Sequence, residues 1–169
     1  DETTKPIIDA IGRAGQRGVQ VKVLSDHIAQ FSYPNRKGTV ARLRELGAEY
    51  LPMLPLMPFK KHWRRPDLRN HRKLVVVDGA LAFTGGINIT DDQNDRINPA
   101  AFHDLHMQLE GAVVRWLQLA FVEDWLYATR TALDDASLWP DAPAGHVLAQ
   151  VLPAGPDSPW EAIHRVQVE

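Results

Sequence analysis

The chain has 169 residues and a 44% hydrophobic composition, which allows one domain with a buried core but not two full domains. Its 19 basic and 21 acidic residues leave a formal charge of −2, which argues against a protein that coats nucleic acid through its overall charge. The absence of cysteine excludes a disulfide framework and a cysteine-ligated zinc site. No run of about 18 apolar residues predicts a membrane-spanning helix, and no N-terminal pattern predicts an export signal.

The first third of the chain alternates helix and strand patterns. In chain order, the sequence predicts a helix over 3–18, a strand over 19–24, a helix over 35–46 and a strand over 48–53. Thr3 or Thr4 is expected to cap the first helix, and Gly47 to stop the second. Such alternation implies crossover connections. We therefore predict an α/β fold with a mixed, mostly parallel sheet flanked by helices.

The stretch 55–70 interrupts this alternation. It contains Pro55, Pro58 and Pro66, which predict a loop. Basic side chains dominate the loop and the residues that follow it: Lys60, Lys61, Arg64, Arg65, Arg69, Arg72 and Lys73. Such a run is ordinarily a solvated face. The alternative is an approach path for an anionic ligand, and Trp63 among these cations would also suit the headgroup layer of an anionic membrane.

The rest of the chain predicts a strand over 102–109, a helix over 111–128 and a strand over 147–152. Asp104 and His106 share one face of the first of these strands and His103 lies on the other, so the three do not predict a metal cluster. A linker rich in Pro and Ala precedes the last strand. We therefore expect a first domain over 1–145 and the start of a truncated second half over 146–169.

The most informative stretch begins with His71 and Lys73, which stand two residues apart. They enter a β-branched run, Val75 to Val77, which predicts a buried strand. Because alternate side chains of a strand point to the same side, the imidazole and the ammonium are expected on one face. That face therefore carries a candidate nucleophile beside a cation.

A glycine-rich segment follows. Gly79 permits a turn, and 80–84 predicts a second short strand. Gly85 and Gly86 would let the backbone approach a ligand closely, and Asn88 adds a side-chain amide. An imidazole, an ammonium, accessible backbone and an amide together suit a bound phosphate group.

The spacing His-x-Lys-x4-Asp-x6-Gly-Gly-x-Asn resembles the HKD signature of the phospholipase D superfamily. Its positions in this chain are His71, Lys73, Asp78, Gly85, Gly86 and Asn88. The flanking sequences that look like the first HKD half of bacterial cardiolipin synthases are 70–73, 83–88, 109–111 and 123–125. The resemblance runs over nearly the whole chain and implies a phospholipase D-like half with one HKD motif.

In the family that this sequence resembles, two HKD motifs meet at one site, where one His attacks phosphorus and the other protonates the leaving alcohol. The resemblance implies that His71 forms a phosphohistidine, while Lys73 and Asn88 hold the non-bridging phosphate oxygens. Asp104 matches by position the carboxylate that contacts the catalytic His. Asp78, although part of the motif, is expected to brace the turn. No metal ion or other cofactor is then required.

The resemblance implies a phosphatidyltransferase like cardiolipin synthase, which moves a phosphatidyl group from one phospholipid, phosphatidylglycerol, to the hydroxyl of another. Gly85 and Gly86 are expected to bind substrate, as are the loop cations Lys60, Lys61, Arg64 and Arg65. The chain begins at Asp1 without Met and is expected to be a piece of a longer protein. A second HKD half in the same full-length chain, or in a homodimer, would complete the site, and the fragment is expected to be inactive without it.

The full-length protein is expected at the bacterial inner membrane, where it would meet an anionic surface, whereas this fragment alone is expected to be soluble. Two alternatives stay open. One is an HKD phosphodiesterase or nuclease, which the basic loop would suit and which the near-neutral total charge opposes, so nucleic acid is not the expected partner. The other is a catalytically silent module that binds anionic headgroups.

Overall fold

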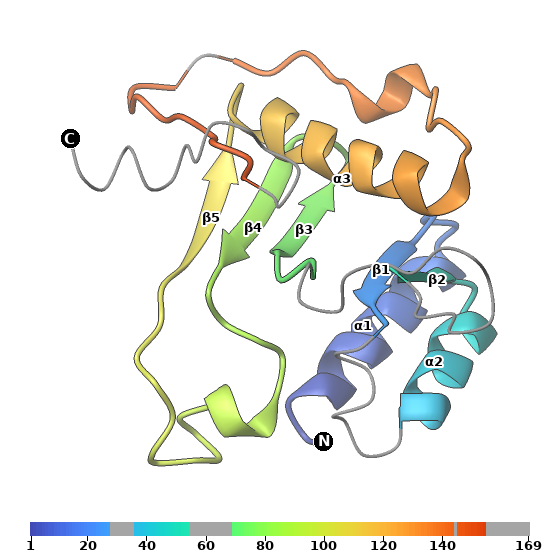
Figure 1. The fold of residues 1–169 in the computed structure, drawn as a ribbon, viewed down its shortest axis with the longest axis vertical. Coiled ribbons are helices and arrows are strands. Elements are labelled where there is room, and N and C mark those ends of the chain that lie inside the picture. Colours follow the sequence, from blue (N-terminus) through green and yellow to red (C-terminus); the bar gives the residue numbers. More distant parts are fainter. Residues whose placement is uncertain (28–35, 55–68, 144, 155–169) are drawn as a thin grey trace. The chain divides into compact units, whose positions relative to one another are not determined.

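The computed structural model describes residues 1–27, 36–54, 69–143 and 145–154. It contains two compact units, of which one comprises 1–71 with 86–105 and the other 72–85 with 106–169 (Figure 1). The elements of the first unit are α1 (Thr4–Gln16), β1 (Lys22–Asp26), α2 (Arg36–Glu45), β2 (Glu49–Met53) and the short 3₁₀ helix η2 (Asp91–Gln93). Those of the second unit are β3 (Lys73–Val77), β4 (Leu81–Gly85), β5 (His106–Glu110), α3 (Val114–Thr129) and the 3₁₀ helix η3 (Ala136–Leu138).

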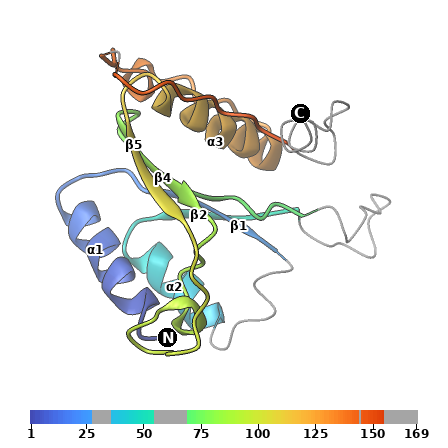
Figure 2. The same cartoon turned by 90° about the vertical axis from the view of Figure 1, so that its left-hand side faces the viewer.

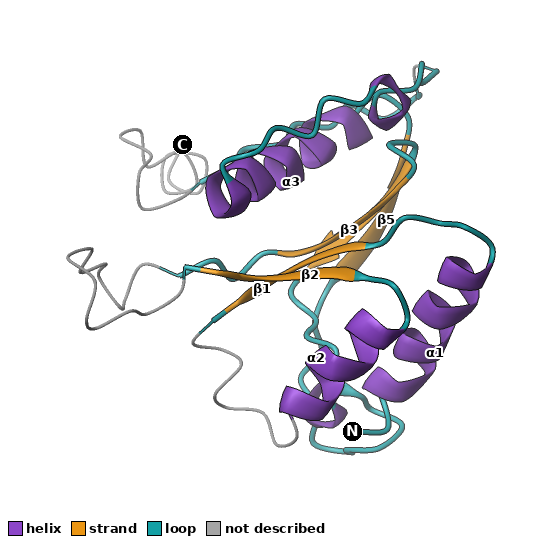
Figure 3. Ribbon diagram, turned by 90° about the vertical axis from the view of Figure 1, so that its right-hand side faces the viewer, coloured by secondary structure: helices purple, strands orange, loops and turns teal. Residues whose placement is uncertain are grey.

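The first unit is a parallel strand pair covered by two helices. β1 and β2 pair in parallel from Lys22 opposite Glu49 to Asp26 opposite Met53. Parallel neighbours require a crossover, and α2 supplies it. The two helices lie on one side of this pair (Figure 3). The buried residues of this unit's core are Leu43, Ala48 and Tyr50. Ile8 and Ile11 of α1 pack against them.

Gly47 ends the second helix as the sequence predicts. Its φ of 84° lies in the left-handed region, which glycine adopts without a Cβ penalty. The N–H of Gly47 donates to Arg44 O at 3.0 Å and that of Ala48 to Leu43 O at 3.0 Å. These two bonds satisfy carbonyls at the end of α2 and turn the chain toward β2.

The N-terminus of α1 differs from the prediction, because neither Thr3 nor Thr4 makes the expected cap. Asp1 Oδ1 accepts a hydrogen bond from Thr4 N at 2.8 Å, and the Asp91 carboxylate accepts from Thr3 N at 2.8 Å and from Glu2 N at 3.1 Å. The backbone N–H and the hydroxyl of Thr3 hold the pKa of Asp91 below its ordinary value of 3.8. A carboxylate distant in sequence therefore occupies the positive end of the helix.

Replacing Asp91 by Asn should lower the free energy of unfolding at neutral pH, because the amide keeps an acceptor but loses the charge at the helix end. A carboxyl whose folded pKa is lowered stabilises the fold above its unfolded pKa, and this contribution is lost as pH falls through the folded value. The difference between wild type and variant should thus shrink as pH falls below the ordinary pKa of 3.8, and it should vanish only below the lowered pKa of the folded state. Urea unfolding at pH 7 and pH 3 measures it.

The neighbouring substitution Asp92→Asn is the control, since the Asp92 side chain is exposed. It should leave the unfolding free energy unchanged at both pH values. An Asp91→Asn variant that is equally destabilised at pH 7 and pH 3 would show that the carboxylate charge is not what stabilises α1.

The second unit is an antiparallel sheet with one helix on it. β4 pairs with β3 and with β5, both antiparallel. α3 lies along one face of this sheet (Figure 2), where Ala82, Val114 and Leu117 form the buried core. Trp125 of the same helix is only 2% exposed. The α/β class is confirmed, and parallel pairing is confirmed for β1 and β2. β3 and β4 pair antiparallel because a tight turn joins them, and β5 pairs antiparallel with β4 after the longer segment 86–105.

Sheet alternation corrects the expectation that the whole run Val75 to Val77 is core. Leu74 and Val76 pack against the buried cluster under α3. Val75 and Val77 point the other way and are 48% and 43% exposed. An antiparallel sheet can have one covered and one open face, so a continuous apolar run does not imply burial of every residue.

Two further strand predictions are corrected. β5 begins at His106 rather than at 102, because its partner β4 ends opposite it at Gly85. The strand predicted over 147–152 does not form within the described residues 145–154, where Val147 and Leu148 are exposed and Val151 packs against the core of the second unit. The boundary at 145 between a first domain and a second half stays a prediction. Within the described ranges, no helix has the length and apolar character needed to cross a membrane.

Candidate functional site

His71 lies just outside regular structure. It is exposed and stands two residues before β3. The residues immediately before it are held in place, since Arg69 and Asn70 both hydrogen-bond to the Asp26 carboxylate at the C-terminal end of β1. In open α/β sheets, ligands bind beyond the carboxyl ends of parallel strands. His71 thus comes directly after two residues that are anchored at the carboxyl end of the parallel strand β1.

Lys73 is the first residue of β3 and is partly buried. It pairs in register with Gly85, the last residue of β4. Because Leu74 and Val76 pack toward α3, strand alternation places Lys73 on the opposite face of the sheet, together with Val75. The ammonium therefore emerges at the strand end that the chain enters directly after His71.

Gly86 and Asp104 lie against each other in the first unit. The N–H of Gly86 donates to Leu105 O at 2.9 Å, and Leu105 N donates to Asp104 Oδ1 at 2.7 Å. A Cβ placed on Gly86 would lie 2.5 Å from Asp104 Cγ and closer still to both carboxylate oxygens. A side chain at position 86 would therefore require the exposed Asp104 carboxylate to shift. Gly86, which the sequence predicts to bind substrate, therefore lies against the side chain of another predicted site residue, Asp104.

Asn88 is placed by its own loop. Its N–H donates to Gln93 Oε1, and its carbonyl accepts from Thr90 N at 3.0 Å. Within the described residues, its side-chain amide makes no hydrogen bond. The backbone is therefore held while the amide stays available for a ligand.

Asp78 belongs to the turn at the far end of β3. It has a φ of 51° and the following Gly79 one of 65°, and Ala80 N donates to Val77 O at 3.1 Å. Two central residues with positive φ are typical of a type I′ turn, for which Asp-Gly is a preferred pair. At about 3.3 Å per strand residue, Asp78 stands roughly 16 Å from Lys73 along the strand, too far to share one phosphate. Its placement is consistent with the expected bracing role.

The basic run is only partly described. Lys60, Lys61, Arg64 and Arg65 lie outside the described residues. Of its described members, Arg69 pairs with Asp26 at 2.7 Å and Arg72 pairs with Asp124 at 2.9 Å. The Arg69 side chain is only 17% exposed. The interpretation of Arg69 as part of an open approach path is therefore corrected, because its guanidinium is held by a carboxylate within the fold.

Asp26 is the residue of this region that sequence reasoning missed. The available signal was its position as a carboxylate directly after an apolar strand in a predicted parallel sheet, where polar side chains often line a site. Its partner could not be read from the sequence, since 43 positions separate it from Arg69. Elsewhere in the described ranges, no group of three or more acidic or His side chains is placed to hold a metal ion.

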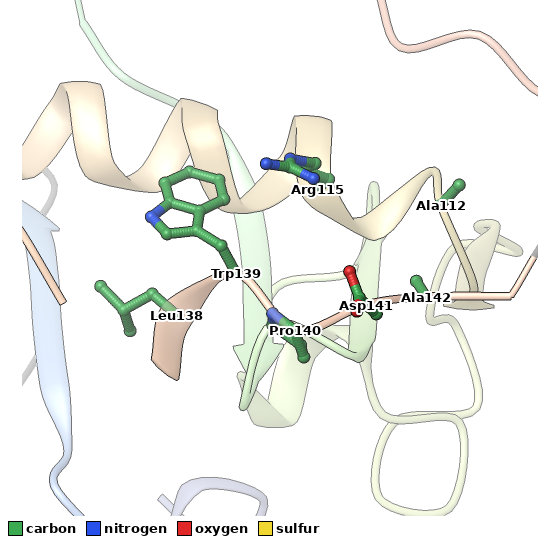
Figure 4. A pocket seen from close by; sticks show the side chains of 8 residues that line it. Ala112, Arg115, Leu138, Trp139, Pro140, Asp141 and Ala142 are labelled. Atoms are coloured by element: carbon green, nitrogen blue, oxygen red, sulfur yellow. The ribbon is translucent and has the colours of Figure 1, made fainter. Parts of the chain in front are cut away.

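A cavity of about 340 Å³ lies in the second unit, beside the turn between β3 and β4 (Figure 4). Gly79, Arg115, Trp139 and Asp141 contribute to its walls, and the Arg115 guanidinium lies 5.8 Å from the centre of the Trp139 ring. Since this turn and Lys73 lie at opposite ends of β3, the cavity is separate from the strand end that carries the motif's ammonium.

Comparisons with known proteins bear on what this arrangement does. The family described as "Cardiolipin synthase, PLD-like domain" matches residues 3–124, which include every motif residue and Asp104. The chain is 36% identical to the major cardiolipin synthase ClsA of Bacillus subtilis, over 96% of this chain and 34% of that protein. It is 34% identical to a cardiolipin synthase of a Geobacillus species, over 96% of this chain and 33% of that protein.

A third relative is cardiolipin synthase A of Pseudomonas fluorescens, at 34% identity over 100% of this chain and 35% of that protein. The chain therefore spans about a third of the length of the curated relatives it matches. No solved structure matches it.

Proposed function

The chain belongs to the cardiolipin synthase family with a phospholipase D-like domain, and from this membership we propose that it forms one catalytic half of a phosphatidyltransferase. The proposed reaction joins two phosphatidylglycerol molecules into cardiolipin and releases glycerol. The observation that carries the proposal is the complete motif from His71 to Asn88 inside the matched region. The relatives' names supply the product, cardiolipin.

In the proposed mechanism the His71 imidazole attacks phosphorus, and the bond between phosphorus and the departing glycerol oxygen breaks. A second imidazole protonates that oxygen, so glycerol leaves as a neutral alcohol. The hydroxyl of the second phosphatidylglycerol then attacks the phosphohistidine, loses its proton to the second imidazole and restores free His71. Lys73 and Asn88 stabilise the charge on the non-bridging oxygens.

The carboxylate of Asp104 is proposed to orient His71. An imidazole can act as a nucleophile only with its attacking nitrogen unprotonated, and a carboxylate on the other nitrogen selects that tautomer. The hydrogen bond that Leu105 N donates to Asp104 Oδ1 supports this role, since it restricts where the carboxylate can lie.

The second imidazole is proposed to come from the remainder of a full-length protein or from a second copy of this chain. The relatives are about three times as long as the region matched, which leaves room for another HKD motif. If a monomer of these 169 residues turned over phosphatidylglycerol, a second motif would not be needed. Analytical ultracentrifugation combined with a lipid assay decides this.

The test of the proposed function is incubation of the full-length protein with phosphatidylglycerol vesicles, followed by mass spectrometry of the lipids. Cardiolipin and glycerol should form in equal amounts. Release of phosphatidic acid or cleavage of DNA without cardiolipin would instead favour a phosphodiesterase or nuclease. Vesicle binding with no product of any kind would favour a silent headgroup-binding module.

We further propose that the protein works at the bacterial inner membrane, with its basic loop against the anionic surface. Changing Lys60, Lys61, Arg64 and Arg65 together to Gln should weaken binding to vesicles that contain phosphatidylglycerol. Since each cation near such a surface contributes about 1 kcal/mol, the loss should exceed 100-fold at low salt. Vesicle sedimentation measures it.

The control for this variant is the same sedimentation with uncharged phosphatidylcholine vesicles. Binding to these should be weak and equal for both proteins. If the quadruple variant bound anionic vesicles as tightly as wild type, these four side chains would belong to a solvated face without a role at the membrane.

A further inference from the structure

The segment before His71 is anchored by an ion pair with a fixed geometry. Arg69 Nε lies 3.1 Å and 3.0 Å from the two Asp26 carboxylate oxygens, and Arg69 Nη2 lies 2.7 Å from Oδ1. The Asp26 side chain is 6% exposed and that of Arg69 is 17% exposed. A planar guanidinium bound by two nitrogens allows little rotation, so the pair sets a direction as well as a distance.

Three further hydrogen bonds fasten the same segment to the ends of β1 and β2. Asn70 N donates to Asp26 Oδ2 at 3.3 Å, and Asn70 Nδ2 lies 3.1 Å from Met53 Sδ. Arg69 Nη2 also donates to Leu54 O at 3.1 Å. Leu54 has a φ of 50°, a backbone conformation that a leucine rarely adopts without support from its surroundings.

Stability alone does not account for this arrangement. Replacing a buried ion pair by apolar residues is often neutral or stabilising, because both charges have been removed from water. Arg69 Nη1 is buried and has no hydrogen-bond partner within the part of the chain that the structure describes. A pair that leaves a buried donor unsatisfied is poorly optimised for stability, whereas it holds Arg69 and Asn70 in one conformation.

We propose that Asp26 and Arg69 are positioning residues that fix the backbone from which His71 projects. Consecutive Cα atoms lie about 3.8 Å apart, so a segment clamped at Arg69 and Asn70 leaves His71 little freedom of placement. Displacement of a reacting group by about 1 Å can lower the rate 100-fold. The inference rests on the proposed function in taking His71 as the group that attacks phosphorus.

The test compares three separate variants of the full-length protein with wild type. They are Arg69→Lys, Asp26→Asn, and the double variant Asp26→Asn with Arg69→Gln. Lysine keeps the positive charge but cannot bind the carboxylate through two nitrogens as the guanidinium does. The double variant removes both charges, so that no unpaired charge is left buried. For folded variants, kcat for cardiolipin formation should fall about 10-fold to 100-fold, whereas KM for phosphatidylglycerol should stay within a factor of about two.

The control is Glu49→Gln, which breaks the exposed Lys22 to Glu49 ion pair across the same two strands. It should leave kcat and KM unchanged. Thermal unfolding of every variant shows whether a lower kcat comes from loss of the folded state or from displacement of His71 within a folded protein. A folded double variant with wild-type kcat would overturn the proposal, and so would a rise in KM with unchanged kcat.

A second readout needs no lipid substrate. Diethyl pyrocarbonate modifies accessible neutral imidazoles, and mass spectrometry gives its rate at His71 relative to the exposed His146 of the same molecule. The relative rate at His71 should rise in the three variants and stay at the wild-type value in Glu49→Gln. If wild type formed no cardiolipin, this readout would still test whether the Asp26–Arg69 pair positions His71. An unchanged relative modification rate of His71 in the folded double variant would overturn that proposal.

Discussion

Replacing His71 by Ala in the full-length protein should abolish cardiolipin formation from phosphatidylglycerol vesicles. The variant lacks the imidazole that is proposed to form the phosphohistidine, so both steps of the proposed transfer lose their covalent path. Removal of a positioned acid–base or nucleophilic group lowers rates by about 10²-fold to 10⁴-fold, which would put the remaining activity at or below background. Quantitative mass spectrometry of extracted lipids measures the product.

His146→Ala is the matched control, since it removes an exposed histidine from the C-terminal part of the described chain. It should form cardiolipin at the wild-type rate. Binding of His71→Ala to phosphatidylglycerol vesicles should also be unchanged, because the expected loss is in the chemical step. Substantial cardiolipin formation by folded His71→Ala would show that this imidazole is not the nucleophile or the acid.

Replacing Gly86 by Ala should displace the Asp104 carboxylate, because the new methyl group would lie 2.5 Å from Asp104 Cγ. Separations under 3.0 Å are essentially never seen for a Cβ, so one of the two must move. If Asp104 orients His71 as proposed, kcat should fall about 100-fold, the order expected when a catalytic group is displaced by about 1 Å. The assay is again cardiolipin formation by the full-length protein.

Two companion variants test the cause of that loss. Asp104→Asn should lower kcat similarly, and combining it with Gly86→Ala should add little, because residues in contact that act through one group are not additive. Gly145→Ala is the control, since nothing lies within 4 Å of the Cβ that it would add. A folded Gly86→Ala protein with wild-type kcat would remove Asp104 from the proposed mechanism.

The sequence by itself determined much of the local structure. The helices near 4–16, 36–45 and 114–129 and the strands β2, β3 and β4 follow from apolar periodicity and from stop signals such as Gly47. These signals act between residues a few positions apart, where helix and strand geometry alone decides which side chains are neighbours. The motif from His71 to Asn88 was readable for the same reason, since its spacing is local.

Pairing and exposure followed only from the tertiary structure. The antiparallel arrangement of β3, β4 and β5 depends on which strands meet, and it leaves Val75 exposed although the run that contains it is entirely apolar. A continuous apolar run indicates a strand without indicating how many of its faces are covered. Exposure is decided by the elements that pack on the sheet, and here the core under α3 takes Leu74 and Val76.

The contacts that bear on the site are likewise tertiary. Asp26 meets Arg69 across 43 positions, Asp91 meets Thr3 across 88, and Asp104 lies on Gly86 only because the chain returns there. A charged side chain has the same local pattern whether it faces water or a distant partner. The sequence therefore determined which chemical groups are present and in what order, whereas the fold decided which carboxylate holds which cation, helix end or glycine.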